Sequence, residues 1–128
     1  ALAVMLCDID SKHYRVFSGE APLGQAILHG FTPHTALVHA DPNTPELSEL
    51  IHDLADNTDS GFVFGGLTSS RTHDAQFALS LDRSSSDAKR VKGVYAGGLS
   101  GVAFSSEVSM LTRVTQGCVP FSEVRCSV

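Results

Sequence analysis

The clearest signal in the sequence is an amphipathic helix that follows a short apolar segment. Four apolar residues recur at i, i+3, i+4 and i+7 and so share one stripe of a helix: Leu47, Leu50, Ile51 and Leu54. Thr44 suits the N-cap position, and Pro45 suits the first helical position. The chain therefore needs a second layer against which this stripe is buried.

Apolar and β-branched segments before and after this helix predict strands. The unbroken run over Ala1–Ile9 indicates a buried strand, and Thr35–Ala40 and Gly61–Leu67 indicate two more. Ala75–Leu81 alternates, with Phe77, Leu79 and Leu81 on one face, as in an antiparallel strand with one wet side.

The C-terminal part predicts two further strands, over residues 94–105 and 108–116, joined by a turn at 105–107. Gly97 and Gly98 weaken the first of these strands unless they serve a bulge or a close approach. A second, short helix is allowed over residues 22–29. The order of elements predicts an α+β fold, in which a mainly antiparallel β-sheet packs against one clear amphipathic helix and this second short one.

Length and charge limit the classes of function. The 128 residues fit one domain, over residues 1–128, and no apolar run approaches the ~18 residues of a membrane helix. A net charge of −5 argues against nucleic acid as a partner. No Lys or Arg lies between Arg15 and Arg71, whereas this stretch is rich in acidic residues: Glu20, Asp41, Glu46, Glu49, Asp53, Asp56 and Asp59. Such a charged face can steer a basic protein partner, which is one hypothesis for function.

The ends of the chain and its cysteines bear on its context. The first residue is not Met, and we expect a fragment of a longer protein. Cys7, Cys118 and Cys126 lack C-x-x-C spacing and are odd in number. Free thiols in a reducing compartment explain them most simply, so we expect an intracellular, cytoplasmic protein.

Two glycine-containing segments at predicted strand ends are the best candidates for a binding site. In the segment Gly65-Gly66-Leu67-Thr68, backbone N–H groups can approach a ligand and a hydroxyl follows them, although a simple turn would use the same residues. The phosphate-loop pattern is absent. Gln116-Gly117-Cys118 places a thiol beside a glycine, where it is either packed or exposed.

Catalysis and metal binding find less support in the residues. A cysteine-dependent hydrolase would need Cys118 exposed, with His39 or His73 within hydrogen-bonding reach. The histidines show no zinc-site spacing, so we expect no metal and no cofactor. Asp8 and Asp10 share strand parity but are more typical of solvated carboxylates than of a catalytic pair.

From Thr35 onward the chain resembles the FIST family, specifically the C-terminal two-thirds of its N-terminal domain. The matching motifs come in the family's order: Ala40-Asp41-Pro42, the leucine-striped helix, Phe64-Gly65-Gly66-Leu67-Thr68-Ser69, Gly97–Ser105 and Val114–Phe121. Val119 departs from the family, because it replaces a basic residue that could contact an anion.

The resemblance implies a sensory or recognition module without established catalytic residues. Its ligand would be a small molecule such as an amino acid, or else a protein partner. A related eukaryotic role is substrate recruitment by an F-box ubiquitin-ligase adaptor. Membranes and nucleic acid are not expected partners. The site we expect joins seven residues at strand ends: Asp41, Gly65, Gly66, Thr68, Gln116, Gly117 and Cys118.

Overall fold

The computed structural model describes residues 4–19, 21–69, 75–79 and 93–113. Its elements are, in chain order, η1 (Ser11–His13), β1 (Tyr14–Phe17), α1 (Leu23–Leu28), β2 (Thr35–Ala40), α2 (Leu47–Asp56), β3 (Phe62–Leu67), β4 (Ala75–Gln76), β5 (Tyr95–Ala96) and β6 (Leu99–Phe104). Four strands form a sheet of order β1-β6-β2-β3, and β4 pairs with β5 separately. The predicted α+β fold with a mainly antiparallel sheet is confirmed, because β6 runs antiparallel to both β1 and β2.

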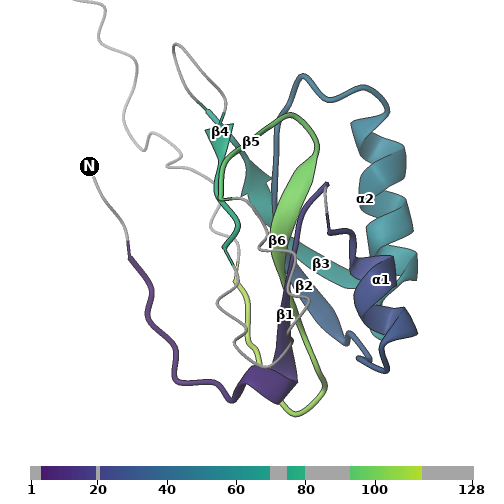
Figure 1. The fold of residues 1–128 in the computed structure, drawn as a ribbon, viewed down its shortest axis with the longest axis vertical. Helices are drawn as coiled ribbons and strands as arrows, with labels where there is room; N and C mark the ends of the chain where they lie inside the picture. The colour runs from purple at the N-terminus through teal and green to yellow at the C-terminus, as the bar shows by residue number, and fades with distance from the viewer. Residues whose placement is uncertain (1–3, 20, 70–74, 80–92, 114–128) are drawn as a thin grey trace, which may run out of the picture.

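Helices and strands are arranged in layers around the four-stranded sheet. Both helices cover one face of this sheet, and β4 and β5 lie on its other side (Figure 1). The core between helices and sheet contains these buried residues: Phe17, Leu23, Phe31, Ala36, Val38, Leu54 and Ala103. We call the face that carries Val38 the helix face and the opposite one the open face.

The parallel pair of β2 and β3 determines where the candidate site lies. Parallel strands need a crossover connection, and α2 provides it. The carboxyl ends of β2 and β3 therefore meet at one edge of the sheet. The Thr68 N–H donates to the Ala40 carbonyl oxygen at 2.7 Å, which ties the two ends together.

The start of α2 corrects one prediction. The helix begins at Leu47, its N-cap is Glu46 with a φ of 54°, and Thr44 does not cap it. The Thr44 hydroxyl oxygen instead accepts a hydrogen bond from the Gly98 N–H at 2.8 Å. The predicted apolar stripe is present, and Leu54 is its buried member.

The predicted N-terminal strand is wrong for the residues that the structure describes. Residues 4–9 form no strand, and Leu6 is 90% exposed. The short strand β1 lies further along and pairs with β6. In the described part of the chain, residues 4–9 pair with no strand, and β1 instead occupies the edge of β6 that β2 leaves free.

The predicted C-terminal hairpin is also wrong. Gly97 and Gly98 have φ values of 79° and 74° and form a turn, so the expected strand over 94–105 divides into β5 and β6. The turn at 105–107 is present, with the Val108 N–H donating to the Ser105 carbonyl oxygen. Residues 108–113 form no strand, and they cannot form a hairpin with β6 because both edges of β6 are already paired. Residues 114–116 lie outside the described chain.

Two shorter predictions have mixed outcomes. The short helix allowed over 22–29 is confirmed as α1. The strand predicted over 75–81 is present only as β4 (Ala75–Gln76), and Phe77 and Leu79 after it are 70% and 66% exposed. Residues 80 and 81 lie outside the described chain. The polar Gln76 is buried in their place because it has hydrogen-bond partners in the neighbouring turn and strand.

Candidate ligand-binding site

A pocket of about 270 Å³ opens where β2 and β3 end, and His39, Gly66, Leu67 and Thr68 line it. His39 and Gly66 are paired in register on neighbouring strands. Each of them is one position along its strand from a residue of the helix face. Because successive residues of a strand point to opposite faces, His39 and Gly66 belong to the open face of the sheet. We call this cavity the His39–Thr68 pocket.

Thr68, which lines this pocket, has an unusual side chain. Its Oγ1 is buried, and no hydrogen-bond partner for it exists among the described residues. A buried hydroxyl without a partner costs about 1–3 kcal/mol, which is why most such groups are paired. An acceptor or donor supplied from outside the described chain would remove this cost.

The two glycines of the predicted site have different roles. A Cβ atom on Gly65, whose φ is 150°, would lie 1.7 Å from the Val38 carbonyl oxygen. Gly65 is therefore required for the close pairing of β2 and β3. A Cβ atom on Gly66 would meet nothing within 4 Å, so this residue leaves open space above the sheet. Of the two, only Gly66 has a backbone that a ligand can approach on the pocket side.

Asp41 holds the turn that leaves β2. Its side chain is 8% exposed, and Oδ1 accepts hydrogen bonds from the Asn43 backbone N–H at 2.8 Å and from Asn43 Nδ2 at 3.2 Å. The Asp41 N–H donates to the Gly98 carbonyl oxygen at 3.1 Å. The predicted site residue Asp41 thus follows β2 directly in the chain, but it is not among the residues that line the pocket.

A second cavity of about 210 Å³ lies on the same face and shares His39 with the first, and most of the residues that line it are apolar. Leu37 and Val102 of the sheet line one side, and Phe77 and Leu79 line the other. The first cavity offers the polar groups of His39 and Thr68, and the second is lined mainly by apolar side chains. Sequence reasoning considered His39 only as a catalytic base, although its parity with Leu37 could have placed it on this face.

A buried polar pair ties β4, which directly precedes the lining residues Phe77 and Leu79, to β6. The Ser100 hydroxyl donates to Gln76 Oε1 at 2.6 Å, and Gln76 Nε2 donates to the Gly98 carbonyl oxygen at 2.9 Å. Gln76 is 3% exposed and Ser100 is 2% exposed. No sequence motif indicated this pair, since the two residues are 24 positions apart.

The sequence as a whole matches the model of the FIST N domain over residues 1–126. The chain belongs to the FIST family. This match is longer than residues 35–121, which contain the individual motifs that resemble the family. FIST domains in general are sensory, ligand-binding modules of signal transduction. No curated protein and no solved structure was found to match the chain.

Part of the site predicted for this FIST domain lies outside the described chain, namely Gln116, Gly117 and Cys118, as does His73. Within the described ranges, no group of three or more His, Cys, Asp and Glu residues could hold a metal ion. Among the helices of these ranges, none combines the length and apolarity needed to cross a membrane.

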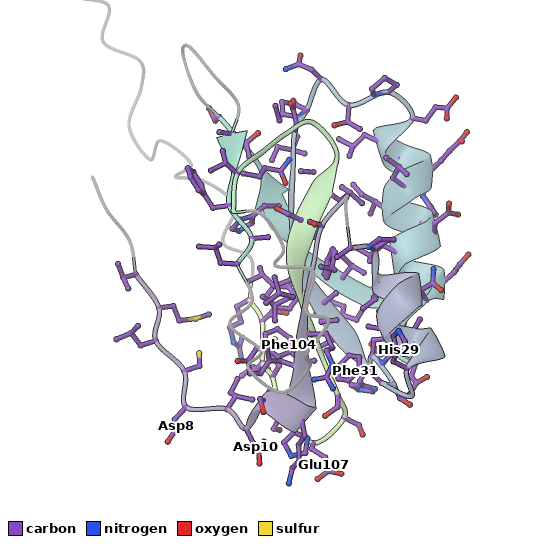
Figure 2. All side chains as sticks on the ribbon, in the orientation of Figure 1. Asp8, Asp10, His29, Phe31, Phe104 and Glu107 are labelled. Atoms are coloured by element: carbon purple, nitrogen blue, oxygen red, sulfur yellow. The ribbon has the colours of Figure 1, made fainter. Side chains whose placement is uncertain are left out.

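The carboxylates near the N-terminus are solvated. Asp8 and Asp10 are exposed and lie with Glu107 towards the same end of the molecule (Figure 2). The Lys12 backbone N–H donates to Asp10 Oδ1 at 3.1 Å and holds the pKa of this carboxyl below its ordinary value. Asp10 thus caps the short turn η1.

Proposed function

We propose that this FIST domain is a non-enzymatic sensory module that binds a small ligand in the His39–Thr68 pocket. The observation that carries the proposal is the buried Thr68 Oγ1, which lacks a partner among the described residues beside the open space over Gly66. A ligand atom that bonds to this hydroxyl would satisfy it.

The chemistry of the two cavities favours a small amphipathic ligand. Threonine hydroxyls both donate and accept, and the His39 imidazole offers a second polar contact. The adjoining cavity around Leu37 and Phe77 suits a short apolar group. A volume of about 270 Å³ is below the range of about 300–1,000 Å³ typical of drug-sized ligands. A free amino acid with an apolar side chain combines these properties, and we propose this class first.

The contacts at the pocket favour binding over catalysis. A hydroxyl nucleophile needs a hydrogen-bonded base, and that base needs a third group to orient it. Thr68 Oγ1 makes no hydrogen bond to His39 in the described chain, so this pair lacks the activating contact. The proposed role therefore involves no covalent step and no metal or cofactor.

The test compares two threonine substitutions by calorimetric titration with individual free amino acids. Thr68→Val keeps the shape but removes the unpaired hydroxyl, so we expect unchanged or higher stability and at least about tenfold weaker binding. Thr58→Val is the control: Thr58 Oγ1 donates to the Ala55 carbonyl oxygen at 2.8 Å, away from the pocket. This variant should lose stability and keep its affinity.

Two results would contradict the proposal. The first is a Thr68→Val variant that binds an amino acid as tightly as the wild type. The second is the absence of binding by any amino acid, which would exclude the proposed ligand class.

A further inference from the structure

The strand β3 forms an edge of the sheet, since only β2 pairs with it among the described strands. Its sequence, FVFGGL, contains no charged residue and no proline. Phe62 is 47% exposed and Leu67 is 59% exposed. Natural proteins usually protect such an edge with charges, proline or bulges, because its free backbone groups pair readily with another strand. This edge lacks the first two of these protections.

The hydrogen bonds of β3 show which backbone groups face outward. The Thr68 N–H donates to Ala40 of β2, and the Phe62 carbonyl oxygen accepts from Thr35 Oγ1 of β2 at 2.7 Å. The backbone groups of successive residues in a strand point alternately to its two sides. Val63, Gly65 and Leu67 therefore present their N–H and C=O groups to the free edge.

The surroundings of this edge are acidic on the helix face. The helix α2 packs on β2 and β3 and, with its flanking loops, carries exposed carboxylates: Glu46, Glu49, Asp53, Asp56 and Asp59. No Lys or Arg lies between Arg15 and Arg71 to neutralise them. An incoming strand with basic side chains would meet a complementary field.

A groove of about 210 Å³ lies between α2 and β3 on the same face, with Ile51, Val63 and Leu67 in its lining. The methylene stem of a Lys or Arg can lie along such an apolar surface while its charge reaches water or a carboxylate. On the open face, the rings of Phe62 and Phe64 stack with centroids 5.9 Å apart and offer an apolar surface. The two faces of the edge thus suit different side chains.

We infer that the free edge of β3 is a docking site for an extended segment of a partner protein in which basic and apolar residues alternate. The segment adds a strand to the sheet through Val63, Gly65 and Leu67. Its basic side chains lie along the groove towards the carboxylates of α2, and its apolar side chains pack on Phe62 and Phe64. A second copy of this chain fits less well, because it would bring the same acidic helix to the seam.

The experiment measures binding of a short fluorescent peptide with alternating Lys and Val by polarisation. A peptide with alternating Glu and Val is its control. In the protein, Leu67→Pro removes an outward N–H at a position where an edge strand tolerates proline, and Leu67→Ala removes the same side chain but keeps the N–H. We expect the Lys–Val peptide to bind, Leu67→Pro to weaken it about tenfold relative to Leu67→Ala, and the Glu–Val peptide not to bind.

Hydrogen exchange locates the contact. Bound Lys–Val peptide should slow exchange of the outward amides of Val63, Gly65 and Leu67, while the inward amides of Phe64 and Gly66 change little. Equal binding of the Glu–Val peptide, equal affinity of the two Leu67 variants, or unchanged exchange at these three amides would overturn the inference. Dimers that form through β3 without any peptide would also overturn it, in favour of a second copy.

Discussion

Replacing Gly65 by alanine should severely weaken the sheet, whereas the same change at Gly66 should not. The new Cβ atom at position 65 would lie 1.7 Å from the Val38 carbonyl oxygen and 2.7 Å from the Val38 carbonyl carbon. Both atoms belong to the backbone of β2, so no side-chain rotation can relieve the overlap. The strands β2 and β3 must separate locally to accept it.

The magnitude follows from two terms. A φ of 150° costs an alanine about 1–2 kcal/mol. The overlap adds about 1–3 kcal/mol, as for an overpacked core. Gly65→Ala should therefore lose about 3 kcal/mol, a large part of the 5–15 kcal/mol that stabilises a typical domain. The melting temperature should fall by about 10 °C.

Gly66→Ala provides the matched control on the neighbouring residue. Its Cβ atom meets nothing within 4 Å, and its φ is not in the left-handed region. The change should leave the free energy of unfolding within about 1 kcal/mol of wild type, or raise it slightly, because alanine restricts the unfolded chain. The added methyl group would still enter the proposed pocket, so ligand binding should suffer more than melting temperature.

Thermal and urea denaturation followed by circular dichroism measure both variants. If Gly65→Ala melts within about 2 °C of wild type, the close contact with Val38 is not required for the sheet, and the reasoning fails. A Gly66→Ala variant that melts early yet binds ligand normally would show that this glycine, too, serves the fold alone.

Two further substitutions and one titration test the rest of the structure. Ser100→Ala leaves Gln76 Oε1 buried without its donor, so the free energy of unfolding in urea should fall by about 1–3 kcal/mol, and an unchanged value would contradict the pairing. Thr44→Val removes the acceptor of the Gly98 N–H in the turn before β6, so the free energy of unfolding should fall by about 0.5–1.5 kcal/mol while the helical circular dichroism signal stays the same. A loss of helical signal would instead support an N-cap role for Thr44. The pKa of Asp10 is lowered in the folded state, chiefly by the Lys12 backbone N–H, so the stabilising contribution of Asp10 is present above the unfolded pKa and is lost as pH falls through the folded pKa. NMR should show the Asp10 carboxyl titrating at a lower pH in the folded protein than in the denatured protein. Equal titration midpoints in the two states would refute the contact.

The sequence by itself determined those elements in which the local apolar pattern matches the side that is buried in the fold. Thr35–Ala40 is mostly apolar and forms β2, largely buried, with the predicted bounds. The stripe that ends at Leu54 formed α2, because a helix with this spacing buries one side against a sheet whatever the order of the strands. The glycine pair at positions 65 and 66 was identified as important from its place at a strand end.

Only the tertiary structure decided which edges pair and which polar groups satisfy one another. The apolar run at the N-terminus and the alternating residues 108–113 resemble strands, but neither pairs with β6, because β1 and β2 occupy both of its edges. Thr44 has the chemistry of an N-cap and is used by Gly98 instead. Likewise, Gly65 and Gly66 are identical in sequence terms, and the position of the Val38 carbonyl alone makes the first essential to the sheet and leaves the second open. A local pattern gives the propensity of a segment, whereas the partner of each edge and each hydrogen bond depends on residues distant in the chain.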